Sequence, residues 1–300
     1  MYIEKNHSPE YYRDKIQSLA NLPTLPIIAT EILRITREDK LSVNQILPII
    51  EKDPPLTMKV LRIANSAYYG LRREIKSIRH AIVVIGLREL SNIAVSFSVI
   101  KELSIDFEGI HFQWKEFWKH SVACGYIAQL LAEELKFPTL SNVYILGLLH
   151  DIGKLVLYRI EPERYIESLE NANRKQCSSY LAEQEVFGIT HSDIGKWTAE
   201  KWRMSDEITN TIGFHHNPDK VQNSEFKIYV SLIQVADMVC NFYNMNFGSE
   251  YIPSNPSEEA GWKILQDVFK DIKGIKFEEF IKKIENEVKT IMEVANLLQA

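Results

Sequence analysis

Apolar side chains recur every three to four residues through most of the chain, which is the spacing of an amphipathic α-helix. In residues 25–38, for example, Ile28, Ile32, Leu33 and Ile35 form a one-sided apolar stripe. The alternation of apolar and polar residues that marks a half-buried strand is scarce. The pattern therefore predicts an all-α protein.

Helix-starting and helix-breaking residues divide the first hundred positions into separate helices. Ser42 is a candidate N-cap, and Pro48 predicts a kink or a shortened helix. Pro55 suits the first turn of the next helix, and Gly70 suits its end. Residues 77–103 are apolar enough for one or two buried helices, with Gly86 as a possible break.

A change in pattern at residues 104–113 suggests a boundary within the chain. A second loop, at residues 246–258, is rich in Gly, Ser, Pro and Asn. We therefore expect three parts: residues 1–107, residues 108–245, and a helical C-terminal part at residues 246–300.

Charge and cysteine usage favour a cytoplasmic protein. Cys124, Cys177 and Cys240 are widely separated and odd in number, which argues against a disulfide framework. The first fifteen residues are polar and charged, unlike a signal peptide, and no apolar run reaches the ~20 residues of a membrane span. The net charge of −5 does not suggest a general nucleic-acid binder.

One local stretch is basic. Residues 54–90 hold seven Lys or Arg against two Glu, and residues 42–70 have a helix-turn-helix rhythm. DNA binding is one interpretation, and two packed helices with solvated charges is the other. Because a two-helix rhythm occurs in any helical domain, we do not expect a nucleic-acid partner.

Five of the eight histidines lie between residues 120 and 216, each near a carboxylate or another histidine. Glu116 and His120 are four residues apart, so a helix places both on one face. A metal ion or a simple hydrogen bond would use this spacing equally well. A lone histidine in an apolar helix is usually structural, but five histidines with such neighbours favour a shared site.

The other members of this set stand near helix ends or in apolar surroundings. Adjacent His150 and Asp151 can converge on one cation only near a helix end or bend, and Gly153 offers that freedom. His191 begins a segment that Thr190 or Ser192 can cap. Two further features are the His215-His216 pair, which ends a helical segment, and Asp237, which lies inside an apolar one.

The residue types in this set indicate a metal site. A buried carboxylate such as Asp237 is costly unless it is paired or bound to a cation. Divalent metals accept mixed imidazole and carboxylate ligands, and two adjacent cations activate water and stabilise a phosphoryl transition state. The set therefore predicts metal-assisted phosphoester hydrolysis.

The ordered motifs resemble those of the HD-domain metal-dependent phosphohydrolase superfamily, and especially its HD-GYP branch. "HDIGK" at residues 150–154 matches the HD-x-G-K signature of that branch. The first half is similar to the HDOD family, an HD-related output domain of bacterial signalling proteins. That similarity rests on three stretches: "LPTLP" (22–26), "KDPPLTMKVLRIANSAYYG" (52–70) and "SIRHAIVVIGLREL" (77–90).

The resemblance implies a multi-helical HD-like bundle at residues 108–245, an HDOD-specific helical subdomain at residues 1–107, and a bacterial signalling role. It also implies a di-metal site with bridging Asp151. The implied ligands are Glu116, His120, His150, Asp151, His191, His215, His216 and Asp237. Lys154 would contact the substrate phosphate or the attacking water, as a catalytic residue beside Asp151. Iron or manganese suits this ligand set, and zinc or magnesium would also be compatible.

Two functions remain open at this point. Many HDOD members lack the metal ligands, whereas this chain keeps them, which favours a phosphohydrolase acting on a nucleotide or phosphodiester. The chain has no Gly-Tyr-Pro element after His216, however. The alternative is therefore a non-catalytic signalling module that binds a protein or nucleotide and keeps only a vestigial or structural metal site.

Overall fold

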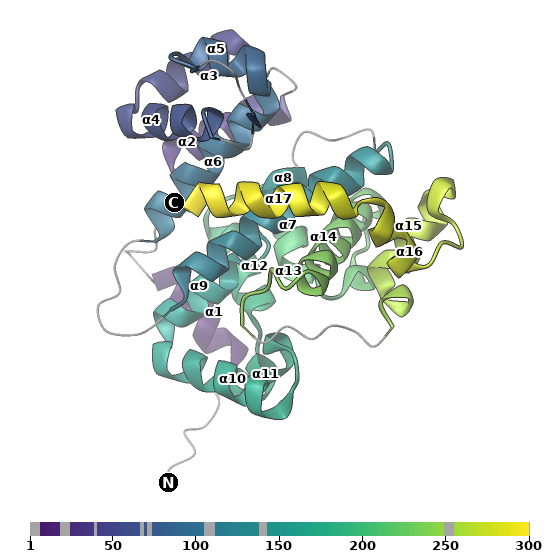
Figure 1. The fold of residues 1–300 in the computed structure, drawn as a ribbon. Coiled ribbons are helices and arrows are strands. Elements are labelled where there is room, and N and C mark those ends of the chain that lie inside the picture. Colours follow the sequence, from purple (N-terminus) through teal and green to yellow (C-terminus); the bar gives the residue numbers. More distant parts are fainter. Residues whose placement is uncertain are drawn as a thin grey trace.

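The computed structural model describes residues 7–18, 25–38, 41–66, 69–70, 74–104, 112–137, 143–248 and 255–299. These residues form α-helices and short 3-10 segments, without a strand among them (Figure 1). The predicted all-α fold is confirmed. Buried apolar side chains from both halves form one continuous core.

The helices of the N-terminal half gather at one end of the molecule (Figure 1). They are α2 (Ile27–Arg37), α3 (Val43–Glu51), α4 (Pro54–Ala64), α5 (Ile78–Ile85) and α6 (Leu87–Leu103). The long helix α6 packs against all four of the others. The first helix, α1 (Pro9–Ser18), instead packs against α12 in the second half.

The structure agrees with the predicted helix break at Gly86 but not with the predicted helix end at Gly70. Gly86, with φ of 86°, separates α5 from α6, and the two helices are bent by 119°. Pro48 lies inside the short helix α3. The predicted end of α4 at Gly70 is wrong, because the helix stops at Ala64. The side chain of Asn65, the residue that follows the helix, bonds to the backbone of Ile75.

The second half contains the longer helices. They are α7 (Trp114–Glu134), α8 (Val143–Leu149), α9 (Ile152–Ile160), α10 (Pro162–Lys175), α11 (Ser179–Phe187), α12 (His191–Lys201), α13 (Asp206–Phe214) and α14 (Ser224–Phe242). Helix α7 packs against α8 and α14, and α9 packs against α12.

The C-terminal helices pack back onto this bundle. They are α15 (Ala260–Val268), α16 (Phe277–Lys283) and α17 (Glu285–Gln299), and short 3-10 segments lie at Pro218–Lys220, Pro256–Glu258 and Lys270–Ile272. Helix α17 runs along α7 and reaches α6 (Figure 1). The proposed boundary near residue 107 lies outside the described residues, and the three-part division stays a prediction.

Two glycine contacts bring pairs of helices unusually close. A Cβ on Gly147 would lie 2.6 Å from the Cα of Gly125, where α8 meets α7. A Cβ on Gly153 would lie 1.8 Å from the carbonyl oxygen of His191, where α9 meets α12, and 2.7 Å from the backbone nitrogen of Gly195. No side chain larger than hydrogen fits at these positions unless the helices move apart.

The basic stretch belongs to the N-terminal helices. Arg72 and Arg73 lie outside the described residues. Lys76 lies 3.7 Å from Glu74, and Arg88 lies 3.1 Å from Glu133 of α7. These pairs support the interpretation of packed helices with solvated charges.

Within the described residues, no single helix has both the length and the apolar character to cross a membrane; α5 and α6 meet the test only as a bent pair.

Candidate metal centre

His150 and Asp151 lie at the break between two helices, since α8 ends at Leu149 and α9 begins at Ile152. This is the helix end that two adjacent side chains need to face one point. The role expected for Gly153 was wrong. It lies inside α9, and its missing side chain permits contact with α12 rather than a bend.

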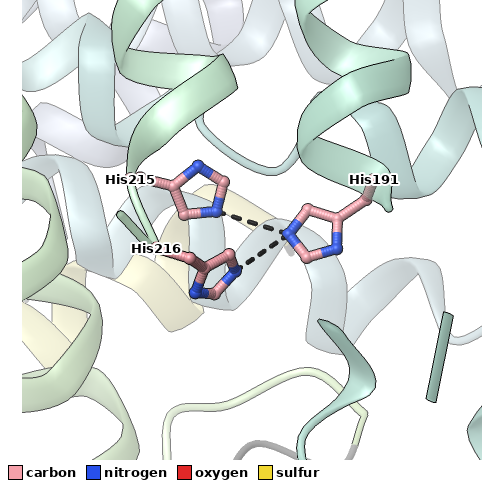
Figure 2. Close-up of side chains that lie close together, drawn as sticks. All are labelled: His191, His215 and His216. Atoms are coloured by element: carbon pink, nitrogen blue, oxygen red, sulfur yellow. Dashed lines mark hydrogen bonds between the residues drawn. The ribbon is translucent and has the colours of Figure 1, made fainter. Parts of the chain in front are cut away.

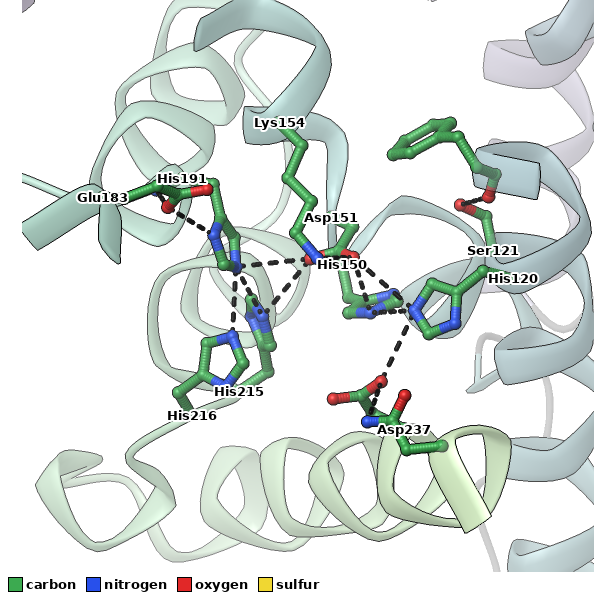
Figure 3. A network of polar contacts seen from close by, with 12 residues as sticks. His120, Ser121, His150, Asp151, Lys154, Glu183, His191, His215, His216 and Asp237 are labelled. Atoms are coloured by element: carbon green, nitrogen blue, oxygen red, sulfur yellow. Dashed lines mark hydrogen bonds and ion pairs between the residues drawn. The ribbon is translucent and has the colours of Figure 1, made fainter. Parts of the chain in front are cut away.

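The two carboxylate oxygens of Asp151 face two different groups of histidines (Figure 3). Its Oδ2 lies 3.5 Å from Nε2 of both His120 and His150. Its Oδ1 lies 3.3 Å from Nε2 of His191 and 3.6 Å from Nε2 of His215. Asp151 therefore lies between the two groups, with one oxygen facing each.

The first group joins α7, the α8–α9 break and α14. Nε2 of His120 lies 3.3 Å from Nε2 of His150 and 3.4 Å from Oδ1 of Asp237. Ligand atoms of His120, His150 and Asp151 all lie within 4.8 Å of one another, so one cation can contact all three.

The second group joins the start of α12 to the end of α13 (Figure 2). Nε2 of His191 lies 3.3 Å from that of His215 and 3.0 Å from that of His216. Asp193 serves the helix rather than the group, because its Oδ2 accepts the backbone N–H of Thr190 at 2.9 Å and caps α12. The three imidazoles can hold a second cation.

The outer ring nitrogens hold these imidazoles in place. Nδ1 of His150 donates to the Gly147 carbonyl at 2.7 Å, that of His120 to Met245 at 2.8 Å, and that of His215 to Ile212 at 2.9 Å. A carbonyl only accepts, so each Nδ1 carries the proton. The Nε2 lone pairs therefore point inward, as metal ligation requires.

This arrangement needs positive charge at its centre. In the neutral form that ligates a metal, imidazoles that meet through Nε2 present lone pairs to one another and to Asp151. Among the described residues the buried oxygens of Asp151 accept no hydrogen bond of good geometry, although the Lys154 ammonium pairs with Oδ2. A divalent cation at each group would satisfy these atoms, and nitrogen and oxygen donors fit such cations.

The pKa shifts of the clustered histidines and of Asp151 show how burial and neighbouring charges act on these groups. Burial lowers the pKa of His150 to about 4, and burial with neighbouring imidazoles lowers the pKa of His215 well below its usual value. Burial also opposes charge on His120, but Asp151 raises the pKa of His120 well above its usual value. Burial would raise the pKa of Asp151, yet His150 and Lys154 hold it well below. Asp151 therefore stays negatively charged between the two groups.

Lys154 lies against the same carboxylate. Its ammonium is 2.7 Å from Oδ2 of Asp151, and the side chain is almost fully buried. The ring of Phe247 lies beside it, with its centre 6.0 Å from Nζ. A buried lysine keeps its charge only when it is paired, so Lys154 brings one positive charge to the site.

One predicted residue is not brought to the cluster, and one important residue was missed. Glu116 is exposed, and its carboxylate lies 3.9 Å from Lys119. Glu183 of α11 is fully buried, and its Oε2 lies 2.7 Å from Nδ1 of His191. A signal existed for Glu183, which is four residues from both Ser179 and Phe187 on the buried stripe of its helix.

Comparison with known proteins supports the fold and the family. The family model of the HDOD domain matches residues 22–218. A solved HDOD domain protein of unknown function from Geobacter sulfurreducens has a similar fold. Its TM-score is 0.83 with 22% sequence identity, and the match covers 97% of each chain.

Two curated relatives are longer than this chain. An uncharacterized protein from Treponema pallidum is 29% identical over 235 residues, which are 78% of this chain and 45% of the relative. Ribonuclease Y from Clostridium botulinum is 32% identical over 122 residues, which are 40% of this chain and 17% of the relative. The chain thus spans less than half the length of either relative.

Proposed function

The chain belongs to the HDOD domain family, and from this premise we propose that it is a bacterial signalling protein with a di-metal phosphohydrolase centre. The substrate class is a phosphodiester or nucleotide. The observation that carries the proposal is the division of Asp151, whose two oxygens face two separate histidine groups. A single structural hydrogen bond would need only one of them.

Each part of the cluster has a task in this proposal. His120, His150 and Asp237 would hold one cation, His191, His215 and His216 the other, and Asp151 both. Bound cations would activate a water molecule and stabilise the charge of a phosphoryl transition state. Iron and manganese are favoured by the mixed imidazole and carboxylate donors, and zinc and magnesium remain compatible.

The residues of the chain supply position and charge. Asp151, kept ionised by its neighbours, orients Lys154 through their 2.7 Å contact. Lys154 is the lysine that pairs with Asp151 among the described residues. Its ammonium would bind an anionic phosphate oxygen. Burial of both groups excludes bulk water and strengthens this electrostatic contact.

One curated relative supports the reaction class. Ribonuclease Y, by its name, acts on RNA, which is a phosphodiester, and it is similar to this chain over 122 residues. His216 is followed by Asn217-Pro218 rather than by a Gly-Tyr-Pro element. We therefore propose the general phosphodiester class and not the cyclic di-GMP of the HD-GYP branch.

A second function is favoured by the closure of the site. Among the candidate ligands in the cluster, His216 is partly exposed, whereas Asp237 is 8% exposed and the others 1% or less. A substrate could reach these ligands only if the side chains around them moved. The alternative proposal is therefore a non-catalytic cytoplasmic signalling module in which the metal site is vestigial or only stabilises the fold, and a signalling protein or nucleotide binds elsewhere.

Metal analysis followed by turnover assays tests both proposals. We would express the protein anaerobically with iron and manganese and measure bound metal in the wild type and in a His150→Ala, Asp151→Ala double variant. Bound metal in the wild type and its loss in the variant are expected. A metal-free wild type would contradict the first proposal and leave only a module with a vestigial site, and phosphodiester turnover that the double variant lacks would contradict the second.

A further inference from the structure

Glu183 is a buried carboxylate that reaches the candidate metal centre from outside. It lies on α11, eight residues before His191, and both side chains are fully buried. Its Oε2 accepts two hydrogen bonds of 2.7 Å, one from Nδ1 of His191 and one from the backbone N–H of the same residue. One oxygen thus fixes both the start of α12 and the ring that α12 carries.

The partner of His191 Nδ1 differs in kind from those of His120, His150 and His215. His120, His150 and His215 donate Nδ1 to neutral backbone carbonyls. His191 donates to a carboxylate, and the other oxygen of Glu183 accepts no hydrogen bond among the described residues. The negative charge of Glu183 is therefore directed to His191, which makes Nε2 of His191 a stronger electron donor.

His191 also occupies the central place in its group. Its Nε2 lies 3.0 Å from His216, 3.3 Å from His215 and 3.3 Å from Oδ1 of Asp151 (Figure 3). A rotation of this ring would withdraw the shared nitrogen from all three partners. The contact between Glu183 and Nδ1, on the opposite edge of the ring, opposes that rotation.

We propose that Glu183 is a positioning residue that sets how tightly the divalent cation at His191, His215 and His216 is held. This inference rests on the proposed metal centre. It assigns to Glu183 a difference between the two cation sites, because only the site with His191 has a carboxylate behind one of its histidines. The cation at His120, His150 and Asp151 does not depend on Glu183, because those imidazoles take their orientation from backbone carbonyls.

The test compares Glu183→Gln with wild type and with Glu185→Gln. Glutamine keeps an acceptor for both hydrogen bonds but removes the charge. Glu185 is a matched control on the same helix, because it is exposed and pairs with Lys175. Each metal-stripped protein would be titrated with Mn²⁺ without oxygen, and bound metal and the manganese spin-resonance spectrum would be recorded.

We expect two bound Mn²⁺ ions with a spin-coupled spectrum in the wild type and in Glu185→Gln. In Glu183→Gln one ion should bind about 10- to 100-fold more weakly, the usual effect of losing an outer partner of a ligating histidine. The spectrum should become that of a single uncoupled ion. Glu183→Asp, which restores the charge at a greater distance, should bind the second ion with intermediate affinity.

The outcomes separate this inference from the proposed function. If the wild type binds no metal, the proposed centre fails and the inference fails with it. If the wild type and Glu183→Gln both bind two ions equally tightly, the inference alone is overturned. If both Glu183 variants stay unfolded even with Mn²⁺, Glu183 serves the fold, and the positioning role is likewise overturned.

Discussion

Gly153 of α9 touches the backbone of His191 so closely that a Cβ on Gly153 would lie 1.8 Å from the His191 carbonyl oxygen. This contact brings the first residue of α12 to the helix break that carries His150 and Asp151. The glycine of the HD-x-G-K signature therefore determines the distance between the two halves of the candidate metal centre.

A Gly153→Ala substitution should accordingly destabilise the protein and separate the two groups. Overpacking a close-packed core costs about 1–3 kcal/mol, and here the obstacle is rigid backbone. Thermal unfolding would measure the loss, and metal analysis the effect on the centre. The control is Gly213→Ala, whose Cβ would meet the flexible side chain of Lys196 at 2.9 Å. Unchanged stability in Gly153→Ala would contradict the close contact.

Single substitutions should divide the centre into its two halves. His215→Ala removes a nitrogen from one group, so we expect about one bound cation per chain, and His150→Ala should do the same at the other group. Asp151→Asn removes the negative charge that both groups share and should leave neither cation tightly bound. Elemental analysis of each variant checks this pattern. Equal metal content in Asp151→Asn and wild type would refute the bridging position.

Removal of metal should lower the melting temperature. A cation that binds only the folded chain at a hundred times its Kd contributes about 2.7 kcal/mol. For a chain of 300 residues the corresponding fall on chelation is about 4 °C. Calorimetry with and without EDTA measures it. The His150→Ala, Asp151→Ala double variant is the control, and it should respond much less.

Lys154→Met should reduce turnover more than metal binding. Methionine keeps much of the volume of the lysine stem but removes the ammonium 2.7 Å from Asp151. If Lys154 contacts the phosphate in the transition state, phosphodiester hydrolysis should fall about 10²- to 10³-fold. Metal analysis of the same samples shows whether both cations remain. Wild-type turnover in this variant would exclude a catalytic role for Lys154.

Glu89 should make stability depend on pH away from the metal centre. Burial raises the pKa of Glu89, although Tyr69 and Tyr126 each donate a 2.8 Å hydrogen bond to its Oε1. Between the usual pKa of glutamate and this raised value, the folded chain binds more protons than the unfolded chain. The free energy of unfolding should therefore fall as pH rises through this window.

The Glu89→Gln variant isolates this contribution, because glutamine does not titrate. Urea unfolding of both proteins across mildly acidic pH, with chelator present, gives the difference in unfolding free energy. We expect the wild type to lose stability relative to the variant as pH rises. A difference that stays constant with pH would show that Glu89 has an ordinary pKa.

Local pattern was sufficient for the helices and for the identity of most cluster residues. Apolar periodicity located α2, and Gly86 marked the break between α5 and α6 because a positive φ there favours glycine. The sequence was insufficient where a distant contact decides. The end of α4 depends on the bonds of Asn65 to Ile75, and the contact of α1 with α12 leaves no local mark.

The sequence by itself determined an all-α chain and the residue types of its candidate centre, because helical periodicity and adjacent pairs such as His150-Asp151 are local properties. Only the tertiary structure decided which side chains meet. It divided the two oxygens of Asp151 between two histidine groups, left Glu116 in solvent and placed Glu183 behind His191. These relations depend on how closely α9 packs against α12, which is fixed by contacts between residues far apart in the chain.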